Sequence, residues 1–355
     1  MRVHLIREWT QAGIEIDLVV SRDEGPLREQ VPKTVRTFVV APRHPLQFPA
    51  GFLHYLRARK PTHVLAAGTD ISALTLLVLK FVGARPPSAI SIHIQLSRDL
   101  ELSSGLARLK TRAAISILRR MVPVCRAVIA VSQGTADDLR QWLPLREGQL
   151  HVIYNPTVTP ESHDRMQAPL TDCPVPAETP WILYAGRLVP TKGLEVLIDA
   201  FGQVAARTSA HLVLMGDGPL IGDISTTIRK RDAPGRIHLV NFQSNPLPWM
   251  REATVLALPS RNEGLPNVLI EAMACGTQIV STDCPSGPAE ILNGGEYGQL
   301  VPVGDASALA EALLRSLDGT FHVHAAALRK RAAEFSSERA AARYLAALTC
   351  GPGGI

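Results

Sequence analysis

Short apolar runs alternate with helical patterns along most of the chain. In the first half, strand-like runs lie at residues 14–20, 35–40, 63–66, 89–94, 127–131 and 151–154. In the second half they lie at residues 181–185, 211–215, 237–240, 255–258, 278–281 and 299–301. Apolar positions recur at helical spacing in the intervals, for example at residues 50–59, 134–142, 193–207 and 220–231. Because strands that alternate with helices form parallel sheets, this pattern predicts an α/β fold with a parallel, doubly wound sheet in each half.

A proline-rich stretch without periodicity separates the two halves. Its prolines are Pro156, Pro160, Pro169, Pro174, Pro176 and Pro180. Aperiodic, polar segments of this kind connect domains. At about 150 residues per domain, a chain of 355 residues has room for two. We therefore predict two Rossmann-like domains that face a cleft, at residues 1–155 and 181–335, with a linker at 156–180 and a helix with a tail at 336–355.

Composition narrows the class of protein and its compartment. No apolar run approaches the about 20 residues that a membrane-spanning helix needs. The chain opens with the pattern of an amphipathic helix that ends near Gly13, and it carries Arg2, Arg7 and Glu8 where a signal peptide has its apolar core. The five cysteines include no C-x-x-C pair, which disfavours a disulfide framework and a zinc site. We expect a cytoplasmic protein.

Positive charge is concentrated in the first half. Residues 1–175 hold 22 basic and 15 acidic side chains, whereas residues 176–355 hold 15 and 17. Seven of the basic side chains lie in segment 98–126, where Leu102, Leu106, Leu109, Ala113, Ile117 and Met121 recur at helical spacing. This pattern predicts one basic amphipathic helix, with either a solvated basic face or a surface for anionic lipid head groups. An aromatic content of 5% leaves few stacking platforms for single-stranded nucleic acid, so we expect no nucleic-acid partner.

Candidate phosphate-binding residues follow the first strand of the second half. Gly186 lets the backbone approach a ligand closely, and Arg187 and Lys192 place two cations at the start of the next helix. A helix N-terminus with added cations favours a phosphate group, although both side chains could also be plain surface charges. Gly216, in the turn after the next strand, is either structural or a ligand contact.

Two glutamates eight residues apart give the strongest chemical signal. Glu263 lies in the loop after the predicted strand 255–258, and Glu271 lies on the helix that we expect Pro266 to begin. Backbone N–H groups of Gly264 and Leu265 would then face a ligand at the helix N-terminus. A buried carboxylate at position 271 needs hydrogen-bond donors, which the hydroxyls of a ribose would supply. Surface glutamates would not explain the apolar residues that flank Glu271.

Together these residues resemble the signature of the retaining family 4 glycosyltransferases of the GT-B fold. The resemblance rests on Glu263-x7-Glu271 with Gly186-Arg187 and Lys192, and on the runs at 216–219, 241–246, 282–290 and 297–305. It covers about residues 10–348 and is dense from Tyr184 to Asp305. The last run is similar to bacterial members that extend lipopolysaccharide core, capsule or lipid-linked oligosaccharides.

The resemblance implies a role for each matching residue. Those at the positions of Arg187 and Lys192 bind the nucleotide diphosphate and stabilise its departure, and the carboxylate matching Glu271 holds the ribose hydroxyls. Glu263 lies by the donor sugar, with backbone groups of Gly264, Leu265 and Pro266. Further implied contacts to the base, the sugar or the phosphate come from Asn241, Phe242, Asn262 and Asn267. His93, which follows the strand at residues 88–92, either contacts the donor or acceptor or is a structural histidine.

The implied function is transfer of a hexose or N-acetylhexosamine, with retention, from a UDP-sugar to a glycan or lipid-linked acceptor at the inner face of the membrane. No cofactor and no metal are expected, because the two cations stabilise the charge. The alternatives are a non-catalytic nucleotide-sugar-binding remnant and, less favoured, a nucleotide-sugar epimerase of the same fold.

One part of the family pattern is missing from the sequence. Family members begin with a strand and a glycine-rich loop before the first helix, whereas this chain opens within that helix. An unfilled central position in the first sheet would leave the neighbouring strand edges unpaired. We therefore expect a misplaced start codon or an incomplete sequence rather than a working shortened enzyme.

Overall fold

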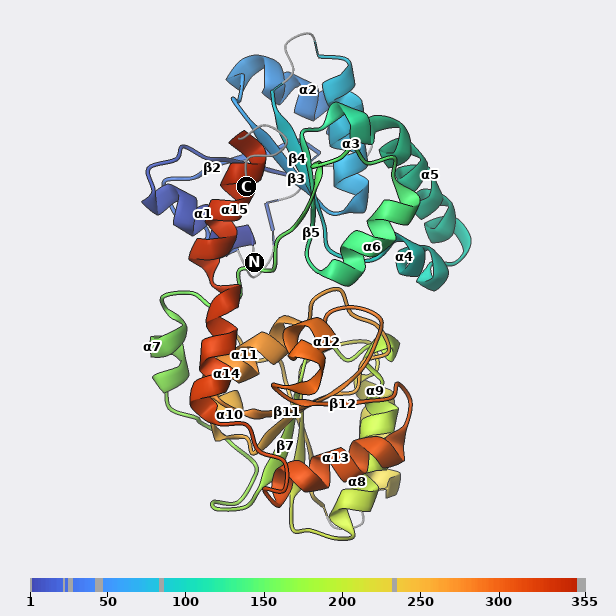
Figure 1. Cartoon of the computed structure of the whole chain (residues 1–355), viewed down its shortest axis with the longest axis vertical. Coiled ribbons are helices and arrows are strands. Elements are labelled where there is room, and N and C mark those ends of the chain that lie inside the picture. The colour runs from blue at the N-terminus through green and yellow to red at the C-terminus, as the bar shows by residue number, and fades with distance from the viewer. Residues whose placement is uncertain are drawn as a thin grey trace. The chain divides into compact units, whose positions relative to one another are not determined.

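The computed structural model divides the chain into two compact units (Figure 1). Unit 1 comprises Met1–Pro156 with Ser337–Ile355, and unit 2 comprises Thr157–Ser336. The structure describes residues 2–21, 23–24, 28–41, 47–82, 86–231 and 235–349. Both units are built from parallel sheets and helices, so the fold class predicted from the sequence is confirmed.

Unit 2 contains one six-stranded sheet in which every pairing is parallel. Its order is β12-β11-β10-β7-β8-β9. The strands are β7 (Trp181–Ala185), β8 (His211–Met215), β9 (Ile237–Val240), β10 (Val255–Leu258), β11 (Gln278–Thr282) and β12 (Gln299–Val301). The central strands β7, β8 and β10 are almost entirely buried. Because both of their faces are covered, they appear in the sequence as continuous apolar runs.

Helices cover both faces of this sheet (Figure 1). One group, in which α8 packs on α13, consists of α8 (Leu194–Ala205), α9 (Ile221–Arg231) and α13 (Ala306–Leu317). The other consists of α10 (Leu247–Glu252), α11 (Asn267–Cys275) and α14 (Ala325–Ala332). The short helices are α7 (Ser162–Gln167), which packs on α10, and α12 (Pro288–Ile291).

The chain adds strands on opposite sides of β7. β8 and β9 lie on one side, whereas β10, β11 and β12 lie on the other. The strand order therefore reverses between β7 and β10, and open parallel sheets bind their ligands outside the carboxyl ends of the strands at such a point. The loops after Ala185 and after Leu258 consequently flank the expected site.

Unit 1 contains two parallel sheets. A pair is formed by β1 (Asp17–Val20) and β2 (Arg36–Val39). A four-stranded sheet is formed, in this order, by β3 (Val64–Ala67), β4 (Ser88–Ile92), β5 (Ala127–Ala130) and β6 (Leu150–Val152). Among the described residues no strand joins β1 to β3, so the single sheet predicted for this half is divided in two.

The four-stranded sheet of unit 1 has a separate core on each face. Ile90 and Ile92 of β4 belong to a large core, whereas Ala89 packs with Tyr344 in a smaller one, as expected when side chains alternate along a strand. Most of the helical residues in the large core come from α2 (Phe48–Arg59), α3 (Thr69–Lys80), α5 (Gly105–Met121) and α6 (Gln133–Trp142). The smaller core lies under α1 (Arg2–Gln11) and α15 (Ser337–Thr349), which are joined by a hydrogen bond from Trp9 Nε1 to the Ala341 carbonyl at 3.0 Å.

The basic segment 98–126 is not the single helix predicted from the sequence. It consists of α4 (Leu96–Leu102) and α5, separated by Ser103 and Ser104 in extended conformation. The Ser103 hydroxyl donates to the Asp99 carbonyl at 2.6 Å. Serine competes with helical hydrogen bonding in this way, which explains the break. None of the helices in the described part of the chain has the length and apolar character needed to cross a bilayer.

Candidate functional site

The turns after β7 and β8 are in backbone contact. The Gly186 N–H donates to the Met215 carbonyl at 3.0 Å. Gly216 has a φ of 151°, and a Cβ atom at this position would lie 1.9 Å from the Gly186 carbonyl oxygen. Only glycine allows this approach, because any side chain would overlap the backbone. Gly216 therefore holds the turn that carries Arg187.

The loops after β7 and β10 meet beside Lys192, at the end of a 3-10 turn that precedes α8. Gly193 is the N-cap of α8, with a φ of 61°, and a Cβ on it would lie 2.3 Å from the Pro259 carbonyl oxygen. The Arg261 N–H also donates to the Thr191 carbonyl at 2.9 Å. These contacts fix Lys192 against the loop that carries Glu263.

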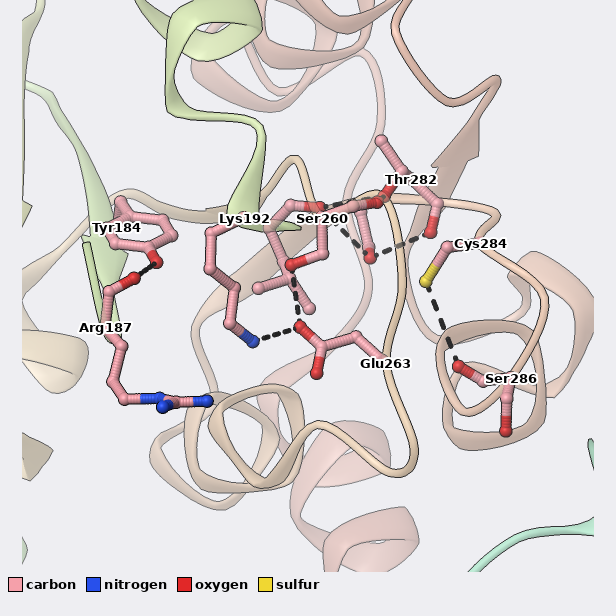
Figure 2. Close-up of polar contacts among 10 residues, drawn as sticks. Tyr184, Arg187, Lys192, Ser260, Glu263, Thr282, Cys284 and Ser286 are labelled. Carbon is pink, nitrogen blue, oxygen red and sulfur yellow. Dashed lines mark hydrogen bonds and ion pairs between the residues drawn. The ribbon is translucent and has the colours of Figure 1, made fainter. Parts of the chain in front are cut away.

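Lys192 and Glu263 form a largely buried ion pair (Figure 2). The Lys192 ammonium donates to Oε1 of Glu263, and the Ser260 hydroxyl donates to the same oxygen at 2.7 Å. The sequence analysis predicted both charged residues as site residues but did not predict that they pair. No role is predicted from the sequence for Ser260. Its position three residues before Glu263 could have indicated the hydrogen bond between them.

The loop that carries Glu263 is braced by the segment after β11. The Thr282 hydroxyl donates to the Ser260 carbonyl at 2.5 Å (Figure 2). The Ser286 hydroxyl donates to the Gly264 carbonyl at 2.9 Å. Both side chains are buried. The sequence run 282–290 therefore positions the backbone of the 260–264 loop, a role that sequence reasoning did not assign.

Arg187 presents a free cation beside this ion pair. Its carbonyl accepts a hydrogen bond at 2.8 Å from the hydroxyl of the buried Tyr184, which holds the main chain. Burial, with a smaller effect of the Glu263 charge, raises the pKa of Tyr184, so this hydroxyl remains a donor. The guanidinium is exposed and makes no ion pair or hydrogen bond with any described residue. In Figure 2 it extends away from the strand, on the same side as the Lys192 ammonium.

Glu271 lies in the second turn of α11. The helix begins at Asn267 and not at Pro266, which is its N-cap in extended conformation. Gly264 remains partly exposed, whereas Leu265 and Pro266 are buried. Ala272 and Met273 are buried beside Glu271, whose carboxylate is partly exposed and accepts no hydrogen bond from the described residues. Burial raises the pKa of Glu271 to about 7, although the positive charge of Arg165 opposes the shift.

The remaining predicted donor contacts lie after β9 and around the start of α11. Asn241 and Phe242 follow β9 at the edge of the sheet and are both exposed. Asn267 is the first residue of α11 and is partly buried. The buried Oδ1 atom of Asn262 has no hydrogen-bond partner among the described residues. Within the described part of the chain, neither Asn241 nor Phe242 makes a hydrogen bond or an ion pair with Lys192 or Glu263, so their part in the site stays a prediction.

His93 belongs to unit 1 and follows the carboxyl end of β4. Its Nε2 lies 3.1 Å from the Ser91 hydroxyl, which in turn lies 2.8 Å from the hydroxyl of Tyr344 on α15. Burial first, and then the charge of Arg2, lower the pKa of His93 to about 4. The imidazole is therefore neutral at physiological pH, with one nitrogen engaged by Ser91. Its role in catalysis stays a prediction.

The structure also describes residues that could bind metals or react as thiols. Two histidine pairs are in ring contact, His211 with His238 and His322 with His324. No group of three or more His, Cys, Asp or Glu among the described residues could hold a metal ion. Burial raises the pKa of the Cys125, Cys275 and Cys284 thiols to about 12. These thiols are therefore unreactive at neutral pH.

The two parallel-sheet units, with a site at the strand-order reversal of unit 2, define the GT-B class. A family model described as "Glycosyl transferases group 1" matches residues 179–319, and one described as "Glycosyltransferase Family 4" matches residues 3–159. The chain belongs to the group 1 glycosyltransferases of the GT-B fold.

Individual relatives agree with this assignment. An N-acetylgalactosamine-N,N'-diacetylbacillosaminyl-diphospho-undecaprenol 4-alpha-N-acetylgalactosaminyltransferase of Campylobacter jejuni is 28% identical over 202 residues, or 57% of this chain and 53% of the relative. The chain thus matches about half the length of this curated relative. Sucrose-phosphate synthase of Thermosynechococcus elongatus superposes with a TM-score of 0.76 at 22% identity, over 96% of this chain and 90% of the other. Anabaena HepE in complex with UDP and glucose gives a TM-score of 0.77 at 20% identity, over 98% and 95%. These structural matches establish the fold.

Proposed function

We propose that this protein transfers a hexose or N-acetylhexosamine from a UDP-sugar to a glycan or lipid-linked glycan acceptor. The acceptor would lie at the cytoplasmic face of the membrane, and the anomeric configuration of the sugar would be retained. The observation that carries the proposal is the group formed by Arg187, Lys192 and Glu263 at the strand-order reversal of unit 2.

The two cations suit the departure of a nucleoside diphosphate. When the bond between the sugar and the diphosphate breaks, negative charge grows on the leaving oxygens, and preorganised cations stabilise that charge. Arg187 has an exposed guanidinium ready for a phosphate, which arginine binds bidentately. Lys192 is held by Glu263 and lies directly before α8, whose N-terminal N–H groups favour an anion.

The neighbouring residues suit the rest of a nucleotide sugar. The Glu271 carboxylate is partly buried without a protein donor, and two ribose hydroxyls would supply the missing hydrogen bonds. The exposed ring of Phe242 offers a stacking face for the base. Glu263, with the backbone of Gly264, Leu265 and Pro266, would then contact the donor sugar. The structurally similar Anabaena HepE has been solved in complex with UDP and glucose, which supports a UDP-sugar donor.

Glu263 would hold the donor sugar and Lys192 in position. It would not act as a nucleophile. Lys192 and Ser260 both donate to Oε1 of Glu263, which ties this carboxylate to the phosphate-binding cation. Retention would instead follow from attack on the same face from which the diphosphate departs, with the leaving phosphate accepting the acceptor proton. Arg187 and Lys192 would supply the charge stabilisation, so we propose that the reaction needs no bound metal.

The proposed acceptor follows from the substrates of two relatives. The Campylobacter jejuni relative acts on a diphospho-undecaprenol-linked sugar, and a lipopolysaccharide 1,6-galactosyltransferase of Escherichia coli is 27% identical over 203 residues. Both names describe growing glycans on a lipid. On this basis we propose a lipid-linked or lipopolysaccharide glycan as the acceptor.

The proposal is tested by measuring UDP release from a panel of UDP-sugars, with and without lipid-linked glycan acceptors. We expect acceptor-dependent release with one UDP-sugar, unchanged by the chelator EDTA. A UDP-sugar that binds but is neither hydrolysed nor used for transfer would instead support the non-catalytic nucleotide-sugar-binding alternative. Absence of UDP binding would overturn the proposal altogether.

A further inference from the structure

The apolar positions of α5 that the sequence places on one stripe do not all face the core. The buried face of the helix consists of Thr111, Ala114, Ile115, Leu118 and Met121. Leu106 and Leu109 lie on the opposite side and are 69% and 63% exposed. Leu102, at the end of α4, is 57% exposed. The segment therefore has a second apolar surface, formed by these three leucines, which no described residue covers.

This surface lies on the flank of unit 1. Helix α5 packs on α3, and Figure 1 shows α4 at the end of α5. Leu106 and Leu109 are one helical turn apart and therefore neighbours on the helix surface. The exposure is large for leucine, which folded proteins bury in preference to most other residues. Three such side chains within eight residues of sequence form a patch and not a scatter of single exposed residues.

Cations surround the three leucines. Arg108, Lys110 and Arg112 are exposed on the same two turns, and α5, described over its full length, contains no acidic residue. On α4, the carboxylate of Glu101, which precedes Leu102 in the sequence, is paired with Arg98 at 2.6 Å. The patch therefore combines apolar side chains with uncompensated positive charge.

We propose that Leu102, Leu106 and Leu109 insert into the surface of an anionic lipid bilayer while Arg108, Lys110 and Arg112 contact its head groups. A soluble acidic protein would satisfy the charge, but a bilayer satisfies both the charge and three solvent-exposed leucines. The inference deepens the proposed function, because it gives the surface by which the protein reaches a lipid-linked acceptor.

Two contributions set the expected affinity for an anionic bilayer. Full removal of a leucine side chain from water strengthens association by roughly tenfold. Each cation near an anionic surface adds roughly fivefold at low ionic strength, and salt screens that part alone. Binding should therefore weaken at high salt without disappearing.

The test is flotation of the full chain with vesicles of phosphatidylcholine and phosphatidylglycerol, and with vesicles of phosphatidylcholine alone. We expect the wild type to float with the anionic vesicles. The double variant Leu106→Ser, Leu109→Ser should lose affinity by roughly a hundredfold. Its melting temperature should stay close to that of the wild type, because both side chains are exposed. The single variant Phe81→Ser is the apolar control, since Phe81 is 78% exposed at the end of another helix.

A charge control separates the patch from net charge. Arg108→Gln, Lys110→Gln, Arg112→Gln should weaken binding, whereas Lys33→Gln, Arg57→Gln, Arg315→Gln removes equal charge from other exposed positions and should not. Equal loss in both triple variants, unchanged binding of the leucine variant, or binding to heparin but not to vesicles would each overturn the inference. Vesicle binding is measured without donor or acceptor. UDP release can be measured with a soluble acceptor and without vesicles. Failure of one proposal is therefore distinguishable from failure of the other.

Discussion

The Lys192 ammonium and the Glu263 carboxylate form a largely buried ion pair that joins the loops after β7 and β10. Replacing one of the two residues leaves the charge of the other unpaired in a position that water reaches poorly. We predict that Glu263→Gln lowers the free energy of unfolding by about 3 kcal/mol. Ser260→Ala, which removes one hydrogen bond and keeps the ion pair, should cost about 1 kcal/mol.

Urea unfolding of a double-mutant cycle checks this coupling. Lys192→Met combined with Glu263→Gln should recover part of the stability that Glu263→Gln alone loses, because no unpaired charge remains. Strictly additive losses would show that the two residues do not stabilise one another in solution.

Glu271 should be unfavourable for stability above neutral pH and necessary for donor binding. Its pKa of about 7 in the folded protein lies above the ordinary 4.5, so the folded state holds a proton that the unfolded chain has lost. The contribution of protonated Glu271 to the free energy of unfolding is therefore fully present below about pH 4.5 and is lost as the pH rises through about 7. We predict that Glu271→Gln raises the melting temperature at pH 8 but not at pH 4.5, and that it weakens UDP binding at both.

Thermal unfolding at the two pH values, with calorimetric titration of UDP, measures both effects. The matched control is Glu311→Gln, an exposed glutamate on α13, which should change neither. Equal UDP affinity for Glu271→Gln and the wild type would reject the assignment to the ribose.

Gly216 should tolerate no side chain. A Cβ there would lie 1.9 Å from the Gly186 carbonyl oxygen, so Gly216→Ala must displace the turn that carries Arg187. We predict a loss of about 2–4 kcal/mol in unfolding free energy together with weaker UDP binding. Gly222→Ala is the control, because a Cβ in that position of α9 meets no atom within 4 Å and should stabilise the helix by about 0.5–1 kcal/mol. Similar effects of the two substitutions on UDP binding would contradict this account.

Tyr344 should act as a positioning residue for His93. Its hydroxyl contacts Ser91, and Ser91 contacts Nε2 of the imidazole, so Tyr344→Phe frees the Ser91 hydroxyl to reorient. We predict a roughly tenfold lower kcat with little change in the KM for the donor, and a shift in the tautomer of His93 seen in its imidazole ¹⁵N resonances. Unchanged tautomer populations would leave the hydroxyl with a packing role only.

Unit 2 could be predicted from the sequence nearly to the residue. The runs at 181–185, 211–215, 237–240 and 255–258 coincide with β7, β8, β9 and β10, because buried parallel strands are continuous in their apolar character. Arg187, Lys192 and Glu263 could likewise be predicted, since each follows a strand of this sheet. In the structure they lie on the two loops that flank the strand-order reversal, and their roles in the site stay predictions.

Other features depend on contacts that leave no local trace in the sequence. Tyr344 meets Ser91 across 253 positions, and no pattern near either residue indicates it. The basic segment was predicted as one helix because Leu102, Leu106 and Leu109 keep the helical spacing through the break at Ser103. Which of two apolar stripes faces the core is decided by the packing of α5 on α3, which periodicity alone cannot specify.

The central claim is that the cations after β7 stabilise a departing nucleoside diphosphate. The most direct test is the rate of acceptor-dependent UDP release from a UDP-sugar by the wild type, Arg187→Ala and Lys192→Ala, at saturating donor. We predict that each substitution lowers the rate by roughly 10²–10³-fold, whereas Arg315→Ala on α13 leaves it unchanged. Wild-type rates in both Arg187→Ala and Lys192→Ala would contradict the account.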